Sequence, residues 1–126
     1  MRKGILIAYV FINIYFSLSS PVYPSDWLQI EDSQDGEKNY IDLASVRYKQ
    51  HIVTFWTKNT DRKGKATKMS FSINCKNGTG AIRDIIIYSS NETVLRSYSY
   101  KEEKLLWGKI ESHSFMNSFK KLLCKD

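Results

Sequence analysis

The sequence predicts an α+β fold in which an antiparallel sheet of about six strands carries a C-terminal helix tethered to it by a disulfide. Residues 68–76 alternate apolar and polar side chains without a break and include Cys75, one of only two cysteines. Such alternation is the pattern of a strand that packs against a core on one face only. Residues 115–123 instead place apolar side chains at helical spacing, and the other cysteine, Cys124, follows directly.

Six extended segments separated by turn signals are predicted before the helix. They span residues 26–30, 39–41, 47–59, 68–76, 81–89 and 94–100. Asp35 and Gly36 mark a hairpin after the first segment because both tolerate positive φ, and polar connections follow at 60–65 and 77–80. The third segment carries apolar side chains on both faces and the fifth contains consecutive isoleucines, so we expect both to be covered strands.

Two stretches depart from this extended pattern. The carboxylate of Asp42 precedes good helix formers and can accept hydrogen bonds from the following amides, so one turn of helix is expected at residues 42–45. Residues 101–110 combine charged side chains with Trp107 and Gly108 but show no period. They are expected to form a loop or a short irregular segment.

The C-terminal helix has a defined start and an asymmetric surface. Ser112 or Ser114 can cap its N-terminus. Its apolar stripe comprises Phe115, Met116, Phe119, Leu122 and Leu123. Lysines crowd the last turns, where cations oppose the negative end of the helix dipole. Cys124 lies at the inner edge of the stripe, where the sheet can meet it.

The first residues have the pattern of a cleaved signal peptide. A positive start precedes an apolar run over residues 4–18, and Ser17 and Ser19 supply the small side chains that signal peptidase accepts. We expect cleavage after Ser19, so residues 1–19 form the predicted signal peptide. A retained membrane anchor is the alternative, but the apolar run falls short of the roughly 20 residues that span a bilayer.

Length and charge bound what the exported chain can be. Removing 19 of 126 residues leaves 107, and losing Arg2 and Lys3 lowers the net charge from +6 to +4. This length suits a single domain, which we place at residues 26–125. The positive charge could favour nucleic acid, anionic lipid or acidic glycans, but the lysines are interspersed with glutamates. This pattern favours a solvated surface instead, and we predict no nucleic-acid partner.

The two cysteines are predicted to form a bridge. Exported proteins occupy oxidising surroundings, which favour a disulfide over a metal pair. A Cys75–Cys124 disulfide would close the C-terminal part of the chain back onto the strand at residues 68–76.

No catalytic motif occurs, so we predict no enzymatic activity, no cofactor and no metal. His51, at a hairpin end, and His113, at the start of the last helix, are the only histidines and are too few for a usual zinc site. A small basic exported protein with two histidines could be a ribonuclease that uses them as base and acid. Nothing in the sequence, however, puts these two residues across one cleft.

Three short motifs follow one another along the chain. Tyr40, Ile41 and Asp42 precede Ser45 and Val46, a later strand ends Ile73-Asn74-Cys75, and the last helix ends Leu122-Leu123-Cys124. Their order and spacing, over about residues 27–124, resemble the surface-adhesin protein E family. The resemblance implies an antiparallel sheet of about six strands, a helix held by the disulfide, and no enzymatic activity. The family's best-known member has a lipid-modified cysteine at its mature start and this chain has none, so surface, periplasm and medium are all open as locations.

The resemblance also implies a protein partner, since members of the family bind host matrix or serum proteins such as vitronectin and laminin. An aromatic side chain among cations on loop segments can anchor a partner while the charges steer it. The candidate binding residues are Trp107, Lys104, Lys109, Arg62, Lys63 and Lys65. Trp27 and Trp56, by contrast, are expected to pack within strands. The alternative function is that of a periplasmic scaffold or inhibitor that binds an endogenous envelope protein.

Overall fold

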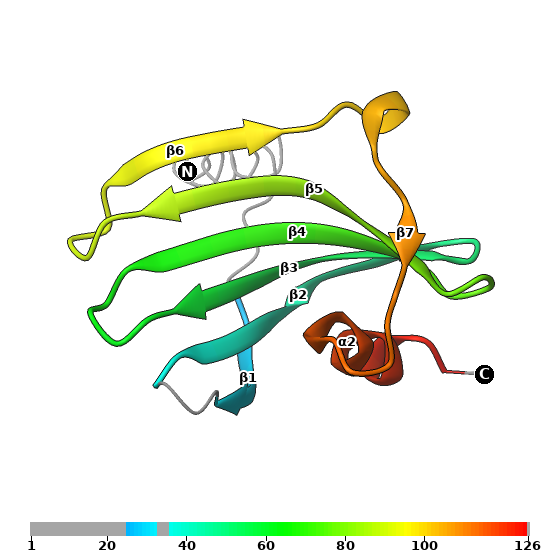
Figure 1. Ribbon diagram of the computed structural model, residues 1–126, viewed down its shortest axis with the longest axis horizontal. Helices are drawn as coiled ribbons and strands as arrows, with labels where there is room; N and C mark the ends of the chain where they lie inside the picture. The colour runs from blue at the N-terminus through cyan, green and yellow to red at the C-terminus, as the bar shows by residue number, and fades with distance from the viewer. Residues whose placement is uncertain (1–24, 33–35, 126) are drawn as a thin grey trace, which may run out of the picture.

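The computed structural model describes residues 25–32 and 36–125, in which one antiparallel sheet carries one α-helix on one face (Figure 1). The strands are β1 (Trp27–Asp32), β2 (Lys38–Lys49), β3 (Ile52–Thr60), β4 (Ala66–Asn74), β5 (Thr79–Tyr88), β6 (Val94–Ser99) and β7 (Gly108–Lys109). They are followed by α2 (Phe115–Leu123). Strands β1 to β6 lie side by side in chain order, and β7 pairs with β5. The predicted sheet and C-terminal helix are confirmed, although the helix has only nine residues.

The predicted signal peptide, residues 1–19, lies outside the described residues. Within the described residues, no helix is long and apolar enough to cross a membrane.

The β1–β2 hairpin occurs where the sequence predicts it. Asp32 pairs with Lys38, and Gly36 has a φ of 88°, which glycine adopts without strain. Asp35, the other predicted turn residue, lies outside the described residues. A Cβ atom at Gly36 would lie 2.6 Å from Cγ of Arg62, so the Arg62 side chain packs directly against this turn.

The helical turn predicted at residues 42–45 is wrong, because these residues form a wide bulge inside β2. Asp42 pairs with Trp56 and Arg47 with Thr54, so four residues of β2 lie opposite a single residue of β3. The Asp42 carboxylate does accept the Ala44 amide, at 3.1 Å, but it also accepts the Asp26 amide at 2.7 Å. The hydrogen bond that suggested a helix turn therefore closes a bulge and holds the start of β1 instead.

A turn at Gln50 and His51 divides the extended segment predicted at 47–59 into the end of β2 and the whole of β3. Gln50 has a φ of 58°. The core then follows the alternation of β3 and β4. Phe55 pairs with Phe71 and Val53 with Ile73, and all four side chains are buried.

The prediction that the strand at residues 68–76 packs on one face only is wrong. Ser70 and Ser72, on the face opposite the core, are 1% and 0% exposed. The Ser70 hydroxyl donates to the Asp84 carboxylate, and the Ser72 hydroxyl contacts Thr54 and Arg83 on the flanking strands. Short serines lie between longer polar neighbours, so hydrogen-bonded polar groups are buried on this face.

The prediction of a buried strand at 81–89 is wrong for most of β5. Ala81 is its only buried residue, and Ile82 is 40% exposed. The reason is tertiary, because α2 packs over β3 and β4, and the outer neighbour β6 is exposed along its whole length. Figure 1 shows β5 and β6 at the top of the sheet, away from α2.

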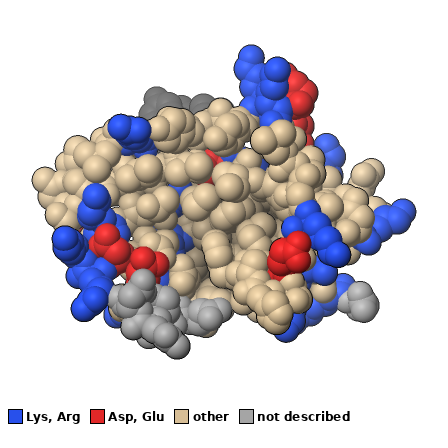
Figure 2. Space-filling model, in the orientation of Figure 1, with Lys and Arg blue, Asp and Glu red and all other residues tan. Residues whose placement is uncertain are grey.

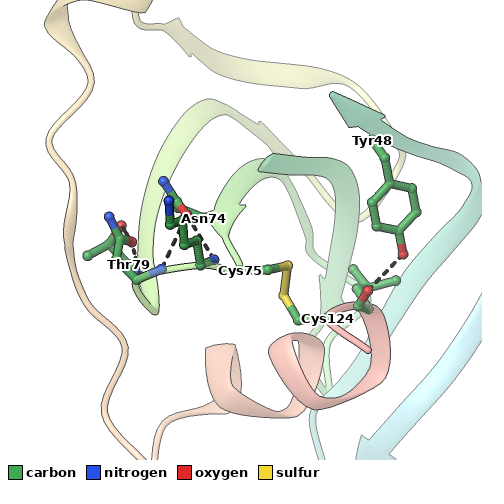
Figure 3. The surroundings of a disulfide bond; sticks show 8 residues. Tyr48, Asn74, Cys75, Thr79 and Cys124 are labelled. Atoms are coloured by element: carbon green, nitrogen blue, oxygen red, sulfur yellow. Dashed lines mark hydrogen bonds between the residues drawn. A yellow bond between two sulfur atoms is a disulfide. The ribbon is translucent and has the colours of Figure 1, made fainter. Parts of the chain in front are cut away.

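Helix α2 is fixed to the sheet by apolar packing and by the predicted disulfide. Phe119 and Leu123 are buried in the core. Cys75, just after β4, bonds to Cys124 at the helix C-cap, with 5.4 Å between the Cα atoms. The Tyr48 hydroxyl also donates to the Leu123 carbonyl at 2.8 Å (Figure 3). Ser114 occupies the N-cap position, but its hydroxyl donates to the Glu111 carbonyl rather than capping the helix.

Candidate functional site: an apolar groove beside the C-terminal helix

An open groove of about 510 Å³ lies between the sheet, the chain that contains β7, and the start of α2. Its floor comes from Met69, Phe71, Gly80, Ala81 and Ile82, and its walls from Tyr100, Lys104, Leu106, Gly108, Lys109, Ile110, Glu111, Ser114, Phe115 and Met116. Most of these side chains are apolar. Concave apolar surfaces with a few polar groups are where proteins bind ligands and partner side chains.

A glycine in β5 allows the walls to approach the floor. A Cβ atom at Gly80 would lie 2.9 Å from Cε of Met116 and 3.2 Å from Cδ1 of Ile110. A larger residue there would have to displace the ends of the Met116 and Ile110 side chains. The Ile110 amide donates to the Gly78 carbonyl at 3.0 Å, and Gly80 pairs with Gly108. The short strand β7, which the sequence did not reveal within the loop at 101–110, thus fixes one wall.

Another part of the groove wall, which includes Lys104, comes from the short 3₁₀ helix η1 (Glu102–Lys104). The Arg83 guanidinium on β5 forms an ion pair with Glu102, and the Tyr100 amide donates to the Arg83 carbonyl at 2.9 Å. The hydrogen bond from Arg83, reinforced by its charge, lowers the pKa of the Glu102 carboxyl. These contacts anchor η1, and so place Lys104 and Leu106 at the groove.

The groove is bordered by apolar side chains that the fold leaves in solvent. Leu106 is 87% exposed, and Tyr100 and Phe115 are each 48% exposed. Figure 2 shows this face of the molecule, with its middle largely free of charged residues and most lysines and arginines near its outline. Contiguous apolar surface with a polar border is typical of an interaction site.

The structure brings two of the predicted site residues to the groove. Lys104 and Lys109 both line it, from η1 and β7. Trp107 lies between them in sequence and is 38% exposed, but it does not line the groove. The neighbouring Leu106 contributes the aliphatic wall in its place.

The other predicted residues, Arg62, Lys63 and Lys65, lie at the far end of the sheet. Their loop precedes Ala66 at the start of β4, whereas Lys109 pairs with Thr79 beside Asn74 at the end of β4. At about 3.3 Å per residue the length of β4 separates the two groups by roughly 26 Å. They do not form one compact site with the groove.

Sequence reasoning missed the apolar residues of the groove, above all Leu106, Phe115 and Ile82. Two signals point to them in retrospect. Leu106 is an aliphatic residue in an otherwise charged segment, and Phe115 extends the helical stripe by one turn beyond the buried Phe119. Neither signal shows by itself that the residues meet.

The two histidines do not meet. The His51 carbonyl accepts the amide of Cys75, whose disulfide partner caps the C-terminal end of α2, whereas His113 immediately precedes the N-cap of the same helix. A nine-residue helix is about 13 Å long, so the pair has no geometry for joint acid–base catalysis. In the described part of the chain, no group of three histidine, cysteine, aspartate or glutamate residues could hold a metal ion.

Comparison with known proteins adds one finding. A family model described as surface-adhesin protein E matches residues 27–125, nearly the whole of the described domain. Searches of curated proteins and of solved structures returned no match.

Proposed function

The chain belongs to the surface-adhesin protein E family, and from this premise we propose that it is an exported, non-catalytic module that binds another protein through the apolar groove. Vitronectin and laminin are the candidate host partners. The proposed location after export is the cell surface, the periplasm or the medium.

The observation that carries this proposal is the groove of about 510 Å³, with Leu106 and Phe115 exposed at its border. Binding is favoured when a partner removes the apolar side chains of a concave site from water. The walls are anchored by the β7 pairing, the Arg83 ion pair and the helix packing. A partner side chain can therefore enter a site that already has its shape, which lowers the entropy lost on binding.

The charges beside the groove define the chemistry of the partner. Lys104 and Lys109 line it together with a single carboxylate, Glu111. The partner segment that fits this site presents one or two large apolar side chains and has acidic residues on either side of them. Complementary charge of this kind raises the association rate and makes binding weaken as salt rises.

We expect Leu106→Asp to weaken binding of immobilised protein to its partner by about 2 kcal/mol, or roughly thirtyfold in Kd. The change places a charge on an apolar wall and adds a negative side chain where the partner is acidic. Trp107→Ala should have a smaller effect, because Trp107 is next to the groove but outside its lining. Surface plasmon resonance with vitronectin and with laminin measures both.

Leu95→Asp is the matched control. Leu95 is an exposed leucine on β6, 53% exposed, and is not part of the groove. Equal weakening by both aspartate variants would refute the groove as the binding surface. If neither vitronectin nor laminin binds, the hypothesis that the protein is a host adhesin is contradicted. The alternative, an endogenous envelope partner, is then tested by labelling intact cells, because a periplasmic scaffold or inhibitor is protected from a reagent that cannot enter.

The export step makes a separate prediction. The protein recovered from its native host should begin at Ser20, because the sequence favours cleavage after Ser19. Intact-mass spectrometry reports this directly. A protein in the envelope that retains Met1 would mean that the first segment is an anchor.

A further inference from the structure

Two lysines face each other on the side of the sheet away from α2. Lys58 on β3 and Lys68 on β4 are direct cross-strand partners. Lys68 immediately precedes Met69, which packs against the core, so the alternation of β4 places Lys68 on the opposite face. Like charges placed directly opposite each other in a sheet destabilise it.

Three aromatic rings hold these ammonium groups. Nζ of Lys58 lies 4.6 Å from the centre of the Trp27 ring and 5.0 Å from that of Tyr40. Nζ of Lys68 lies 5.7 Å from the Trp27 ring and 5.1 Å from that of Tyr88. Both cations are therefore directed to one shared indole by attraction to the faces of the rings.

No carboxylate in the described part of the chain forms an ion pair with either lysine. Partial burial, followed by the charge of Lys68 and opposed by that of Glu92, lowers the pKa of the Lys58 ammonium. The direction of this shift agrees with the geometry, since two cations share a partly dehydrated site. An anion placed between the ammonium groups would relieve their repulsion.

A hollow of about 220 Å³ adjoins the pair. It is lined by Ser25, Trp27, Asp42, Trp56, Lys68, Ile86 and Tyr88. The one carboxylate in it, Asp42, is already occupied on Oδ1 by the amides of Asp26 and Ala44. The remaining lining consists of three aromatic rings, the aliphatic side chain of Ile86, the Ser25 hydroxyl and the Lys68 side chain itself. The slightly positive C–H groups of a sugar ring pack well on such aromatic faces.

We propose that this face is a binding site for an acidic glycan, in which a sugar ring occupies the hollow and its sulfate or carboxylate group lies between Lys58 and Lys68. Charge-assisted hydrogen bonds from the two ammonium groups to the acidic group supply the affinity. The aromatic lining selects a ring-shaped ligand over a free anion. This site is separate from the groove, because it lies on the other face of the sheet.

The test measures binding of the purified protein to oligosaccharides of equal length by isothermal titration calorimetry. The probes are heparin, which carries sulfate and carboxylate groups, hyaluronan, which carries carboxylate groups only, and dextran as the neutral sugar. We expect heparin or hyaluronan to bind and dextran to bind at least about tenfold more weakly, because it lacks the charge-assisted contacts. Binding of heparin without binding of hyaluronan identifies sulfate as the acidic group, and binding of hyaluronan shows that a carboxylate is sufficient.

The matched variants are K58Q/K68Q and K63Q/K65Q, which remove the same charge from the site and from the β3–β4 loop. The first should weaken binding of the acidic probe about tenfold or more, and the second by about twofold or less. K58R/K68R should retain binding, since arginine keeps the charge and stacks on aromatic rings. If K58Q/K68Q fails to fold, as judged by circular dichroism, the single variants K58Q and K68Q replace it, and unaltered binding of the acidic probe by both would contradict the proposal.

Three results would overturn the proposal. They are no binding of either acidic probe, equal loss in the two glutamine variants, and dextran binding as tight as that of the acidic probes. Leu106→Asp should leave glycan binding unchanged. The failure of this inference is therefore distinguishable from failure of the proposed function.

Discussion

Phe119→Ala is expected to lower the free energy of unfolding by about 3–5 kcal/mol, the range for truncating a phenylalanine in a packed core. Phe119 is 1% exposed and is the centre of the contact between α2 and the sheet. Its ring centre lies 5.3 Å from that of Phe55 and 6.5 Å from that of Phe71. Removing it leaves a cavity between the two layers that the β3 and β4 backbones are too rigid to fill.

The same helix provides the control. Phe115 lies one turn earlier, is 48% exposed, and contacts the rings of Phe119 and Phe71. Phe115→Ala should lower stability by only about 1–2 kcal/mol, since about half of the ring is already in water. Urea unfolding followed by tryptophan fluorescence measures both variants. If both variants lose a similar amount of unfolding free energy, contacts other than those of Phe119 hold α2 on the sheet.

Cys75→Ser is expected to lower the free energy of unfolding by about 2–5 kcal/mol, the usual result of losing a native bridge in a small exported domain. The disulfide joins residues 49 positions apart, for which the chain-entropy estimate is roughly 4 kcal/mol, before any native strain is subtracted. Unfolding of α2 from the sheet is otherwise opposed by a small buried surface, chiefly Phe119 and Leu123.

Cys124→Ser should have nearly the same effect, and the double variant should be no worse than either single one, because all three remove one bond. Losses that add in the double variant would mean that the cysteines act separately. Titration of thiols in the unfolded, unreduced protein is an independent check. Two reactive thiols in protein matured in an oxidising compartment would contradict the bridge.

These two stability predictions bear on binding. Phe115 and Met116 form one wall of the groove and belong to the same nine-residue helix. A helix that detaches removes that wall. Both core and disulfide variants should therefore bind a partner less well in proportion to the fraction of molecules with α2 detached, whereas Leu106→Asp should weaken binding without a comparable change in stability.

Much of the fold could be predicted from local pattern, but the candidate site could be predicted only in part. Lys104 and Lys109 are predicted as cations beside Trp107 on a loop segment, and both line the groove. The floor, however, comes from β4 and β5, and the far wall from α2. No local pattern shows that Ile82 and Leu106 line the same groove, because this depends on how β7 returns to pair with the start of β5.

The sequence by itself determined the elements that can be predicted from the pattern of their own residues. Alternation over residues 68–76 specified β4, helical spacing specified α2, and a cysteine at the end of each specified the bridge. The spacing of apolar residues is a property of a short segment and does not depend on the rest of the chain. The bridge could be predicted because the chain has only two cysteines and is expected to be exported.

Only the tertiary structure decided between alternatives that share the same local chemistry. The Asp42 carboxylate accepts nearby amides in a helix turn or in a bulge, and it was the distant amide of Asp26, together with the Trp56 amide donating to the Ser45 hydroxyl, that selected the bulge. The sequence pattern predicts that Ser70 and Ser72 face solvent, but groups on the flanking strands bury them. Likewise, Lys58 and Lys68 read as ordinary surface lysines until Trp27 from β1 was placed beside both. In each case the deciding partner lies far along the chain, and its contribution exists only once the strands are paired in register.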